Sequence, residues 1–369
     1  MLSVFQSPAR YTQGKHATAR LGAELRRIGL SGPALILSSP SPARLLGDVW
    51  ATALGEADIH YRVELFGGEC SPDEVERVCE AAQAAGAAVI IGAGGGKVLD
   101  TSRAVAAELG LPTVNCPTVA SSDAPCSALS VVYTPGGEFL EFRFYPRNPD
   151  LVLVDTALIA QAPSRLLVAG IGDALATWWE AKAVREANAG NQLGGKPTMT
   201  GTALAELCYE LLLSNSVGAK AACDANVVTP ALENLVEANT LLSGLGFESG
   251  GLAAAHSVHN GLTAVPETHD FMHGEKVAFG LVTQLVLENR PRHDLDQVLE
   301  LAWRVGLPIT LAQVGIGTVT ADVVAVIAAK SVAEGETIHN EPFAVDAEAV
   351  GDAIVAGDRI GTRFLADHS

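Results

Sequence analysis

The sequence is poor in positive charge. It has 24 lysines and arginines against 42 aspartates and glutamates, which gives a formal net charge of −18 at pH 7. A field of that sign argues against nucleic acid and against anionic membranes as partners. It says nothing positive about the substrate.

Long apolar runs and closely paired cysteines are also missing. No stretch reaches the roughly 18 apolar residues that a membrane-spanning helix needs. The first residues have no basic start and too short an apolar run for a signal peptide. The six cysteines form no Cys-x-x-Cys pair and suit neither a zinc knuckle nor a disulfide framework. We therefore expect reduced, mostly buried thiols in a cytoplasmic protein.

What is present favours a folded chain with a large core. Of the 369 residues, 48% are hydrophobic and 18% are charged. These proportions are typical of an ordered globular protein, and the length suggests two domains.

The first 160 residues alternate between strand-like runs and helical segments. Strands are predicted at residues 34–37, 59–66, 87–91, 112–115, 139–144 and 151–154. Helices are predicted at residues 72–86 and from the end of the loop 92–97 to about residue 109. Strands that alternate with helices need crossover connections, which predicts a largely parallel sheet.

From Pro163 onward the periodicity is helical and no convincing strand occurs. Helices are expected at residues 164–188, 199–217, 230–242 and 251–263, with Gly and Pro at the joins. The predicted organisation is an α/β domain with a Rossmann-like parallel sheet at residues 1–162, followed by an all-helical domain at residues 163–369.

Four of the nine histidines fall between residues 256 and 273. His256 and His259 are three apart and share one face of a helix. His273 follows after a break at Pro266, so two helices meeting across a turn could direct His256 and His273 at one ion. A single histidine is usually an ordinary surface or core residue, but neutral imidazole is a common transition-metal ligand and the clustering favours a metal site.

Asp173 lies in an apolar helical segment, where a carboxylate is costly unless it is paired or bound to metal. Taken alone, it is more often a cap or an ion-pair partner. Together with His256 and His273 it would give three protein ligands and an open fourth position, which is the catalytic rather than the structural arrangement.

The glycine-rich loop Gly92–Lys97 joins a predicted strand to a helix. Glycine lets a backbone approach a ligand closely, and the helix start offers free N–H groups, which together suit a pyrophosphate. The spacing departs from both the Rossmann and the P-loop motifs, and a tight strand-to-helix turn is the alternative. Asp100, three residues after Lys97, could accept a ribose hydroxyl or pair with a neighbour.

A second polar segment, residues 117–127, follows the end of another predicted strand, where ligands bind in open α/β sheets. Thr118, Ser121 and Ser127 offer hydroxyls without bulk, and Asp123 is a carboxylate among small residues. An ordinary capped loop is the alternative for such a run.

These segments resemble the iron-containing alcohol dehydrogenase family. The matching stretches keep the family's order and span nearly the whole chain: residues 7–15, 92–101, 117–128, 170–181 and 256–280. The resemblance is specific because Ser-Ser-Asp-Ala-Pro at 121–125 occurs together with His-Gly-Glu-Lys-Val-Ala-Phe-Gly at 273–280. It implies a dinucleotide-binding domain, a helical domain and an active site in the cleft between them.

The resemblance also implies roles for single residues. The catalytic metal, zinc despite the family's name, would be held by Asp173, His256 and His273. The phosphates and ribose of NAD would be faced by Gly95, Gly96, Lys97 and Asp100, and its nicotinamide side would be lined by Thr118, Ser121, Ser127, Leu129 and Tyr133. Asp123 would accept a hydrogen bond from a substrate hydroxyl. His259 is a candidate proton relay, although support of a neighbouring ligand is the more ordinary role.

The implied activity is the reversible oxidation of glycerol and related vicinal diols to dihydroxyacetone and its analogues, with NAD as hydride acceptor. Members of the family form homo-oligomers, often octamers. One departure concerns the cofactor: Ser38 and Ser39 stand where similar enzymes carry the acid that disfavours a 2′-phosphate, so NAD is expected and tolerance of NADP is open.

Three alternatives are weighed against this activity. A dehydroquinate synthase-like lyase and a glycerol-1-phosphate dehydrogenase share the fold, but their anionic substrates need several basic residues, which the site segments lack. A non-catalytic metal- or nucleotide-binding protein would need a closed coordination shell. The sequence offers no obvious fourth ligand, and His269 and Asp270 are the candidates left open.

Overall fold

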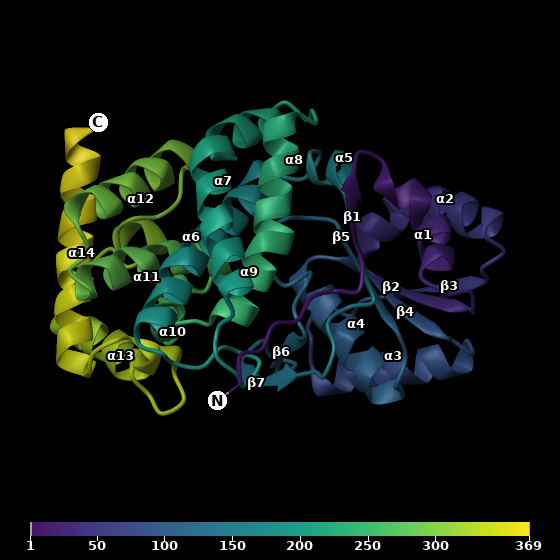
Figure 1. The fold of residues 1–369 in the computed structure, drawn as a ribbon, viewed down its shortest axis with the longest axis horizontal. Coiled ribbons are helices and arrows are strands. Elements are labelled where there is room, and N and C mark those ends of the chain that lie inside the picture. The colour runs from purple at the N-terminus through teal and green to yellow at the C-terminus, as the bar shows by residue number, and fades with distance from the viewer. Residues whose placement is uncertain (1, 369) are drawn as a thin grey trace. The chain divides into compact units, whose positions relative to one another are not determined.

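The computed structural model describes residues 2–368 and divides into two compact units (Figure 1). One unit comprises residues 6–163 and 222–244, and it contains all the named strands. The other comprises residues 2–5, 164–221 and 245–368. The two units are described separately.

The first unit is built on a six-stranded sheet with the strand order β1-β8-β5-β4-β2-β3. Its strands are β1 (Tyr11–Gly14), β2 (Ala34–Ser38), β3 (Tyr61–Leu65), β4 (Val89–Gly94), β5 (Thr113–Pro117) and β8 (Leu151–Asp155). Every neighbouring pair is parallel, which confirms the predicted parallel sheet. β2 and β8 are buried along their whole length, and this explains the four consecutive apolar residues with which each begins.

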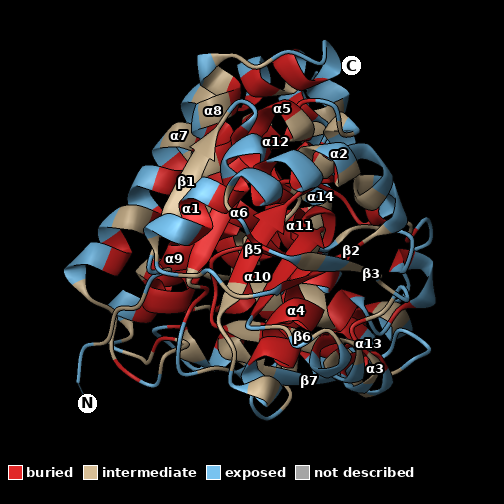
Figure 2. Cartoon of the chain, turned by 90° about the vertical axis from the view of Figure 1, so that its right-hand side faces the viewer, coloured by how far each residue is buried: buried red, intermediate tan, exposed pale blue. Residues whose placement is uncertain are grey.

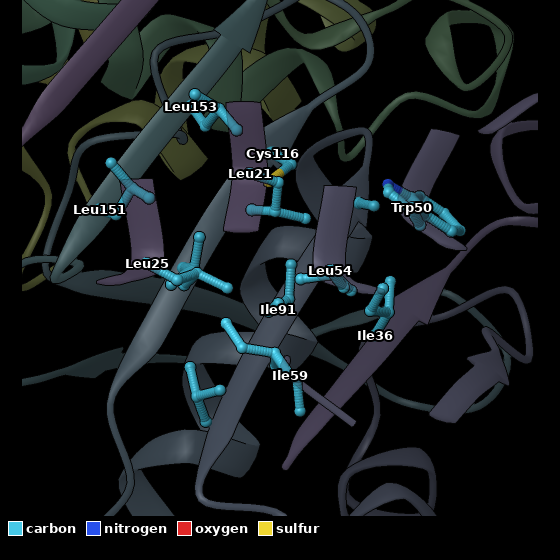
Figure 3. Packing of buried hydrophobic residues seen from close by; sticks show 14 of the residues in the cluster. Leu21, Leu25, Ile36, Trp50, Leu54, Ile59, Ile91, Cys116, Leu151 and Leu153 are labelled. Carbon is cyan, nitrogen blue, oxygen red and sulfur yellow. The ribbon is translucent and has the colours of Figure 1, made fainter. Parts of the chain in front are cut away.

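Helices cover both faces of this sheet. Successive residues of a strand point to opposite sides, and here both sides carry apolar residues that need to be buried. Ile36 and Ile91 pack on the side of α1 (Leu21–Arg27) and α2 (Pro40–Glu56), in the cluster drawn in Figure 3. The intervening residues Leu35, Leu37 and Ile90 pack on the other side. There they meet α3 (Pro72–Ala84) and α4 (Gly96–Leu109) through residues such as Val75, Val78 and Val105.

The helix predicted at residues 72–86 is α3, and its ends follow the sequence signals. Ser71 accepts a hydrogen bond from the backbone N–H of Glu74 at 3.3 Å, and Pro72 is the first helical residue. Gly86 follows the helix with a φ of 58°, a conformation that favours glycine.

In the sheet unit, the elements without a predicted counterpart include β1, α1, α2 and β6 (Leu129–Tyr133). β1 is short, polar and only half-buried at the sheet edge, so it carries no apolar run to detect. β6 pairs antiparallel with β7 (Phe139–Phe144), and these two strands form a separate small sheet beside α4. The short helix α5 (Thr156–Ile159) follows β8.

Residues 222–244 join the sheet unit through contacts with β1. Gln13 donates from Nε2 to the backbone oxygen of Glu233 at 2.9 Å, and Tyr11 Oη lies 2.8 Å from Thr240 Oγ1. The segment holds α8 (Pro230–Glu237) and a π-helical turn, Ala238–Leu242. Both lie within the helix that the periodicity predicts at residues 230–242.

After Pro163 the described chain is helical, as predicted, apart from an isolated bridge between Ser3 and Lys196. The remaining helices are α6 (Ser164–Glu186), α7 (Met199–Asp224), α9 (Ser243–Gly250), α10 (Ala254–Leu262), α11 (His273–Leu287), α12 (Arg292–Val305), α13 (Ala321–Ser331) and α14 (Ala347–Asp367). Much of α6 and α11 is buried, as the red ribbon of Figure 2 shows.

The six cysteines are not joined in disulfides, in line with the expected reduced thiols. Five are buried and Cys79 is half-buried. Within residues 2–368, no helix is long and apolar enough to cross a membrane.

Candidate metal centre and nucleotide loop

A pair of glycines brings α6 and α11 into backbone contact. A Cβ on Gly172 would lie 2.2 Å from the carbonyl oxygen of Gly274, and a Cβ on Gly274 would lie 1.8 Å from the carbonyl oxygen of Ala169. Real side chains do not tolerate such distances, so both positions need glycine for this approach. The next residue of α6 is Asp173 and the residue before Gly274 is His273, so the contact places these two side chains together.

Asp173, His256 and His273 form one group of potential metal ligands. One ligand atom from each lies within 4.8 Å of the other two. Nε2 of His273 is 3.0 Å and Nε2 of His256 is 3.4 Å from Oδ1 of Asp173. The Asp173 side chain is fully buried and that of His273 is 42% exposed, so the group is open on the His273 side. The sequence prediction of a three-residue group is thus confirmed in its geometry.

The charges of this group favour a cation at its centre. Burial by itself would raise the pKa of Asp173, but His273 and His256 outweigh it and hold that pKa well below its usual range. Burial lowers the pKa of His256, whereas Glu180 and Asp173 raise it, and the net result is a pKa well above the ordinary value. Two fully buried carboxylates therefore flank His256, and they require positive charge nearby, either a proton or a metal ion.

Glu180 is a residue of this site that sequence reasoning did not single out. Its Oε2 lies 2.6 Å from Nδ1 of His256, and its Oε1 accepts the backbone N–H of His256 at 3.0 Å and that of Ala253 at 2.9 Å. A carboxylate on Nδ1 holds the proton there and leaves Nε2 available to a metal. The available signal was its spacing: Glu180 is seven residues after Asp173, two helical turns along the same face of α6.

The first N–H groups of α10 are capped by side chains from elsewhere in this unit. Helix starts leave such donors unpaired, and Ala253 at the N-cap has no side chain that could accept them. Besides Glu180, Oε1 of Glu341 accepts from Ala254 at 3.2 Å and Oε1 of Gln284 accepts from Ala255 at 2.9 Å. These bonds fix the start of the helix and with it the position of His256, its third residue.

His259 contacts a metal-site histidine but does not belong to the three-ligand group. Its Nε2 lies 3.0 Å from Nδ1 of His273, and its Nδ1 lies 3.1 Å from Oδ1 of Asn260. Asn260 in turn donates from Nδ2 to Oε2 of Glu336 at 2.8 Å. Burial lowers the pKa of His259 well below its usual value, with further lowering from His273, and this favours the neutral ring.

The alternative fourth ligands do not join the group. Among the described residues, the group that contains Asp173 has only His256 and His273 as further members, and neither His269 nor Asp270 is part of it. Nε2 of His269 lies instead 3.0 Å from the backbone oxygen of Thr263.

In the sheet unit, the glycine loop lies between β4 and α4 as predicted, and its glycines fall into two kinds. A Cβ on Gly92 would lie 2.5 Å from the Ser102 side chain, and a Cβ on Gly94 would lie 2.6 Å from the Val98 side chain. Internal packing therefore requires glycine at both positions. A Cβ on Gly95 or Gly96 would meet the protein only at 3.5 Å or beyond, which is ordinary contact. The protein's own packing therefore leaves room at Gly95 and Gly96, beside the N-terminus of α4.

The other predicted cofactor residues lie around this loop. The Lys97 side chain is exposed and pairs with Glu69, and its Nζ lies 5.3 Å from the centre of the Tyr133 ring. Leu129 and Tyr133 are half-buried at the two ends of β6. Thr118 is buried, and its backbone N–H donates to the oxygen of Gly94 at 3.0 Å, next to the loop.

Asp100 pairs with a neighbour, which is one of its two predicted roles. Its carboxylate and the guanidinium of Arg103 form a buried ion pair, and Arg103 also donates to the backbone oxygen of Ala124 at 2.6 Å. Burial raises the pKa of Asp100 to about 6 although Arg103 opposes the shift. Arg103, which sequence reasoning did not single out, thereby links α4 to the segment that carries Ser121, Asp123 and Ser127.

That segment is also held by residues 238–244 of the same unit. Asn239 donates from Nδ2 to the backbone oxygen of Ala120 at 3.1 Å, and Ser243 donates from Oγ to Oδ2 of Asp123 at 3.1 Å. Ser121 and Asp123 are half-buried, and Ser127 is buried with its Oγ 3.3 Å from the oxygen of Ala124. Ser38, at the end of β2, is buried with its hydroxyl 3.1 Å from the oxygen of Ser39.

Comparison with known proteins agrees with this arrangement. Residues 8–156 match the family model described as iron-containing alcohol dehydrogenase. A glycerol dehydrogenase from Citrobacter freundii is 48% identical over 366 residues, which cover 99% of this chain and 100% of that protein. A glycolaldehyde reductase from Halobacterium salinarum is 47% identical over 98% of this chain and 99% of its own length.

The solved structure of glycerol dehydrogenase from Schizosaccharomyces pombe has the same fold. It superposes with a TM-score of 0.95 at 38% sequence identity, over 99% of this chain and 92% of that one. The similarity therefore extends over both compact units and is not limited to the sheet. The chain belongs to the iron-containing alcohol dehydrogenase family, among its glycerol dehydrogenases.

Proposed function

We propose that this chain oxidises glycerol and related vicinal diols to the corresponding ketones, reversibly, with NAD as hydride acceptor and zinc as the bound metal. The observation that carries the proposal is the group formed by Asp173, His256 and His273 in a chain 48% identical to a glycerol dehydrogenase over its full length. The group has the composition of an open zinc site, with three protein ligands and access from one side.

The donor set fits zinc in chemistry as well as in number. Zinc at this position would act as a Lewis acid toward a substrate hydroxyl. The protein keeps its ligands in the required form: the depressed pKa of Asp173 keeps it anionic, and Glu180 holds the proton of His256 on Nδ1. The ring nitrogens that face the group are Nε2 of both histidines.

For His259 we assign the supporting role rather than the relay. A neutral His259 with its proton on Nδ1 donates to Asn260 Oδ1 and accepts at Nε2 from Nδ1–H of His273. This direction of hydrogen bonds again leaves Nε2 of His273 free to bind an ion. Each of the two histidine ligands is then oriented by a partner on its Nδ1.

NAD binding is supported by the loop at the start of α4. Gly95 and Gly96 leave space beside free N–H groups at a helix N-terminus, which suits a pyrophosphate. Lys97, exposed near Tyr133 and paired with Glu69, places an ammonium donor beside the loop. Ser38, at the end of β2, has no charge to repel a 2′-phosphate, so we expect weaker discrimination against NADP than an acid would give.

Asp123 is proposed to bind a substrate hydroxyl. Its carboxylate is half-buried and anchored by Ser243, so it presents an acceptor in a fixed position. Such an acceptor favours polyols over simple alcohols, because a lone alcohol has no second hydroxyl to donate.

A second substrate class is favoured by a specific relative. The Halobacterium protein, 47% identical over nearly the whole chain, is a glycolaldehyde reductase. Reduction of a small hydroxyaldehyde by NADH, which gives a primary alcohol of a vicinal diol and NAD⁺, would use the same groups and is the second candidate for the physiological reaction. The ratio of kcat/KM for glycolaldehyde with NADH to that for glycerol with NAD⁺ separates the two.

The proposed function is tested by stripping the protein with a chelator and following NADH absorbance with glycerol and NAD⁺, before and after zinc is added. Activity should vanish on stripping and return with zinc, and a parallel NADP⁺ assay measures the effect of Ser38 and Ser39. Zinc binding without turnover of glycerol, 1,2-propanediol or glycolaldehyde would overturn the substrate assignment. Phosphorylated substrates would then be assayed.

A further inference from the structure

The small sheet formed by β6 and β7 exposes an unusual amount of apolar surface. Phe139, Leu140, Phe142 and Phe144, all in β7, are 54%, 49%, 49% and 57% exposed. Figure 2 shows this strand in the colours of exposed and half-buried residues. Proteins that remain monomeric avoid exposed apolar edge strands, because such strands template pairing with another chain.

One face of the hairpin packs on the protein and the other does not. Ser130 and Val132 of β6 are buried, and Ser130 donates from Oγ to the backbone oxygen of Asp100 in α4. Arg143, opposite Ser130 in the register, pairs with Glu108 of the same helix. The charged positions of β7 are therefore on the α4 side, and the alternate residues Leu140, Phe142 and Phe144 are on the side away from α4.

The outer edge of β7 has free backbone groups. The backbone N–H of Tyr145 donates to the oxygen of Ala128 at 2.7 Å, in line with the antiparallel register of the two strands. Hydrogen-bonded positions alternate along such a pair, so Glu141 and Arg143 bond to β6, while the intervening Phe142 directs its N–H and C=O outward. Within the described residues, β6 is the only strand that pairs with β7.

The sequence of β7 is self-complementary about Phe142. An antiparallel copy centred on that residue places Leu140 opposite Phe144, Phe142 opposite itself and Glu141 opposite Arg143. Apolar residues meet on one face and two symmetry-related ion pairs form on the other. Centring instead on Leu140 or Phe144 leaves at least one of the two charged residues without an oppositely charged partner inside the strand.

We infer that β7 is an interaction surface for a second copy of this chain, with the two strands joined edge to edge about a two-fold axis at Phe142. The contact is isologous and joins two hairpins into a four-stranded antiparallel sheet. Each chain carries a net charge of −18, which opposes association in general. β7 carries one positive and one negative side chain, so it is a place where two such chains can approach.

The charge pattern provides a test on the full-length, metal-loaded protein by light scattering or sedimentation. The wild type should be an even-numbered oligomer of the 38.2 kDa chain. Glu141→Arg and Arg143→Glu each place like charges opposite one another across the axis. Either variant alone should fall to half of the wild-type mass or less.

Mixing the two single variants separates an interface from a merely structural role. One chain then carries only positive charge at these two positions and the other only negative charge, so the mixed pair is complementary across the axis. Within each chain the wild-type contact between Glu141 and Arg143 remains broken. Recovery of the wild-type mass only in the mixture is expected. A monomeric wild type, or single variants that keep the wild-type mass, would overturn the inference.

Cross-linking tests the register. Directly opposed residues of a hydrogen-bonded antiparallel pair have Cα atoms about 5.5 Å apart, within reach of a disulfide. Phe142→Cys should therefore give a covalent dimer on mild oxidation, whereas Leu140→Cys, whose partner is Phe144 of the second copy, should give little. The native thiols are buried or half-buried and contribute a low background. Efficient cross-linking through position 140 but not 142 would refute this pairing.

Discussion

The two histidines of the metal centre differ in how the protein holds them. On the α10 side, His256 has a fully buried carboxylate on its Nδ1, and the same carboxylate binds its backbone N–H. On the α11 side, His273 is 42% exposed and has a neutral imidazole on its Nδ1. A buried charge in fixed bonds constrains a ligand more than a neutral partner at the surface does. We therefore expect the α10 side to set metal affinity and the α11 side to adjust it.

The largest effect should come from Asp173→Ala, because Asp173 contacts both sides at once. The variant loses a ligand and leaves Glu180 as the remaining buried charge, so zinc binding and activity should both fall below detection. Metal content after dialysis and NADH formation measure this. Asp296→Ala, at an exposed ion pair on α12, is the control and should keep both. Full zinc occupancy in Asp173→Ala would contradict the assigned ligand set.

The next effect, Glu180→Gln, tests the α10 side directly. The carboxylate accepts from Nδ1–H of His256 with one oxygen and from two backbone N–H groups with the other. The Gln amide has only one acceptor oxygen, so its NH₂ group would face one of these buried N–H donors. We expect zinc affinity to fall about 10–100-fold, as is usual when a partner of a ligating histidine is lost. Competition with a chromogenic chelator gives the dissociation constant.

Glu341→Gln is the matched control for that variant. Glu341 caps the same helix through Ala254 but touches neither histidine. Its substitution should leave zinc affinity unchanged, whereas equal losses in Glu180→Gln and Glu341→Gln would mean that helix capping alone, and not the contact with Nδ1, determines affinity.

A smaller effect is expected on the α11 side. Asn260→Ala removes the acceptor that fixes the tautomer of His259, a neutral hydrogen bond worth about 1 kcal/mol, so zinc affinity should fall roughly fivefold. Glu336→Gln keeps an acceptor for Asn260 Nδ2 and should cost less. Isothermal titration of the stripped protein measures both. If Asn260→Ala weakened binding more than Glu180→Gln, the order of the two sides would be reversed.

The last effect concerns Glu341 and is a change in stability rather than in metal affinity. Burial and the neighbouring Glu288 raise the pKa of Glu341 to about 9. For a raised carboxyl pKa, the stabilisation is complete below the unfolded-state pKa and is lost as pH rises toward 9, at up to about 1.4 kcal/mol per pH unit. Glu341→Gln cannot ionise, so urea unfolding between pH 6 and 9 should show a flatter decline than the wild type. Parallel declines would show that Glu341 does not titrate in this range.

The sequence predicted those features that are local in the chain. The parallel sheet followed from unbroken apolar runs such as 34–37, and the loop at 92–97 followed from its glycines between a strand and a helix. The three metal ligands were reached through composition and family resemblance. The sheet and loop signals each lie within a few neighbouring residues, whereas the ligands span residues 173 to 273 and were grouped through the resemblance.

The remaining features depend on residues that are distant in sequence. In the sequence, nothing distinguishes Glu180 from any other acidic residue of a weakly amphipathic helix. Its contact with His256 exists only in the folded structure. Arg103 is identifiable as a link to Ala124 only once α4 is packed. β1 and β6 are short strands whose pairing, not their composition, defines them. Long-range contacts of this kind leave no periodic trace in the sequence.

The glycine contact between α6 and α11 has a consequence for redesigning metal preference. Because Gly172 and Gly274 bring the two helix backbones into contact, helix packing sets the separation of the backbone at Asp173 and His273. Selection for a different ion can therefore change the type of donor at positions 173, 256 and 273 without altering the frame that carries them. Most substitutions of the two glycines would force the helices apart. A mutant library should therefore vary the ligands and their hydrogen-bond partners and keep positions 172 and 274 as glycine.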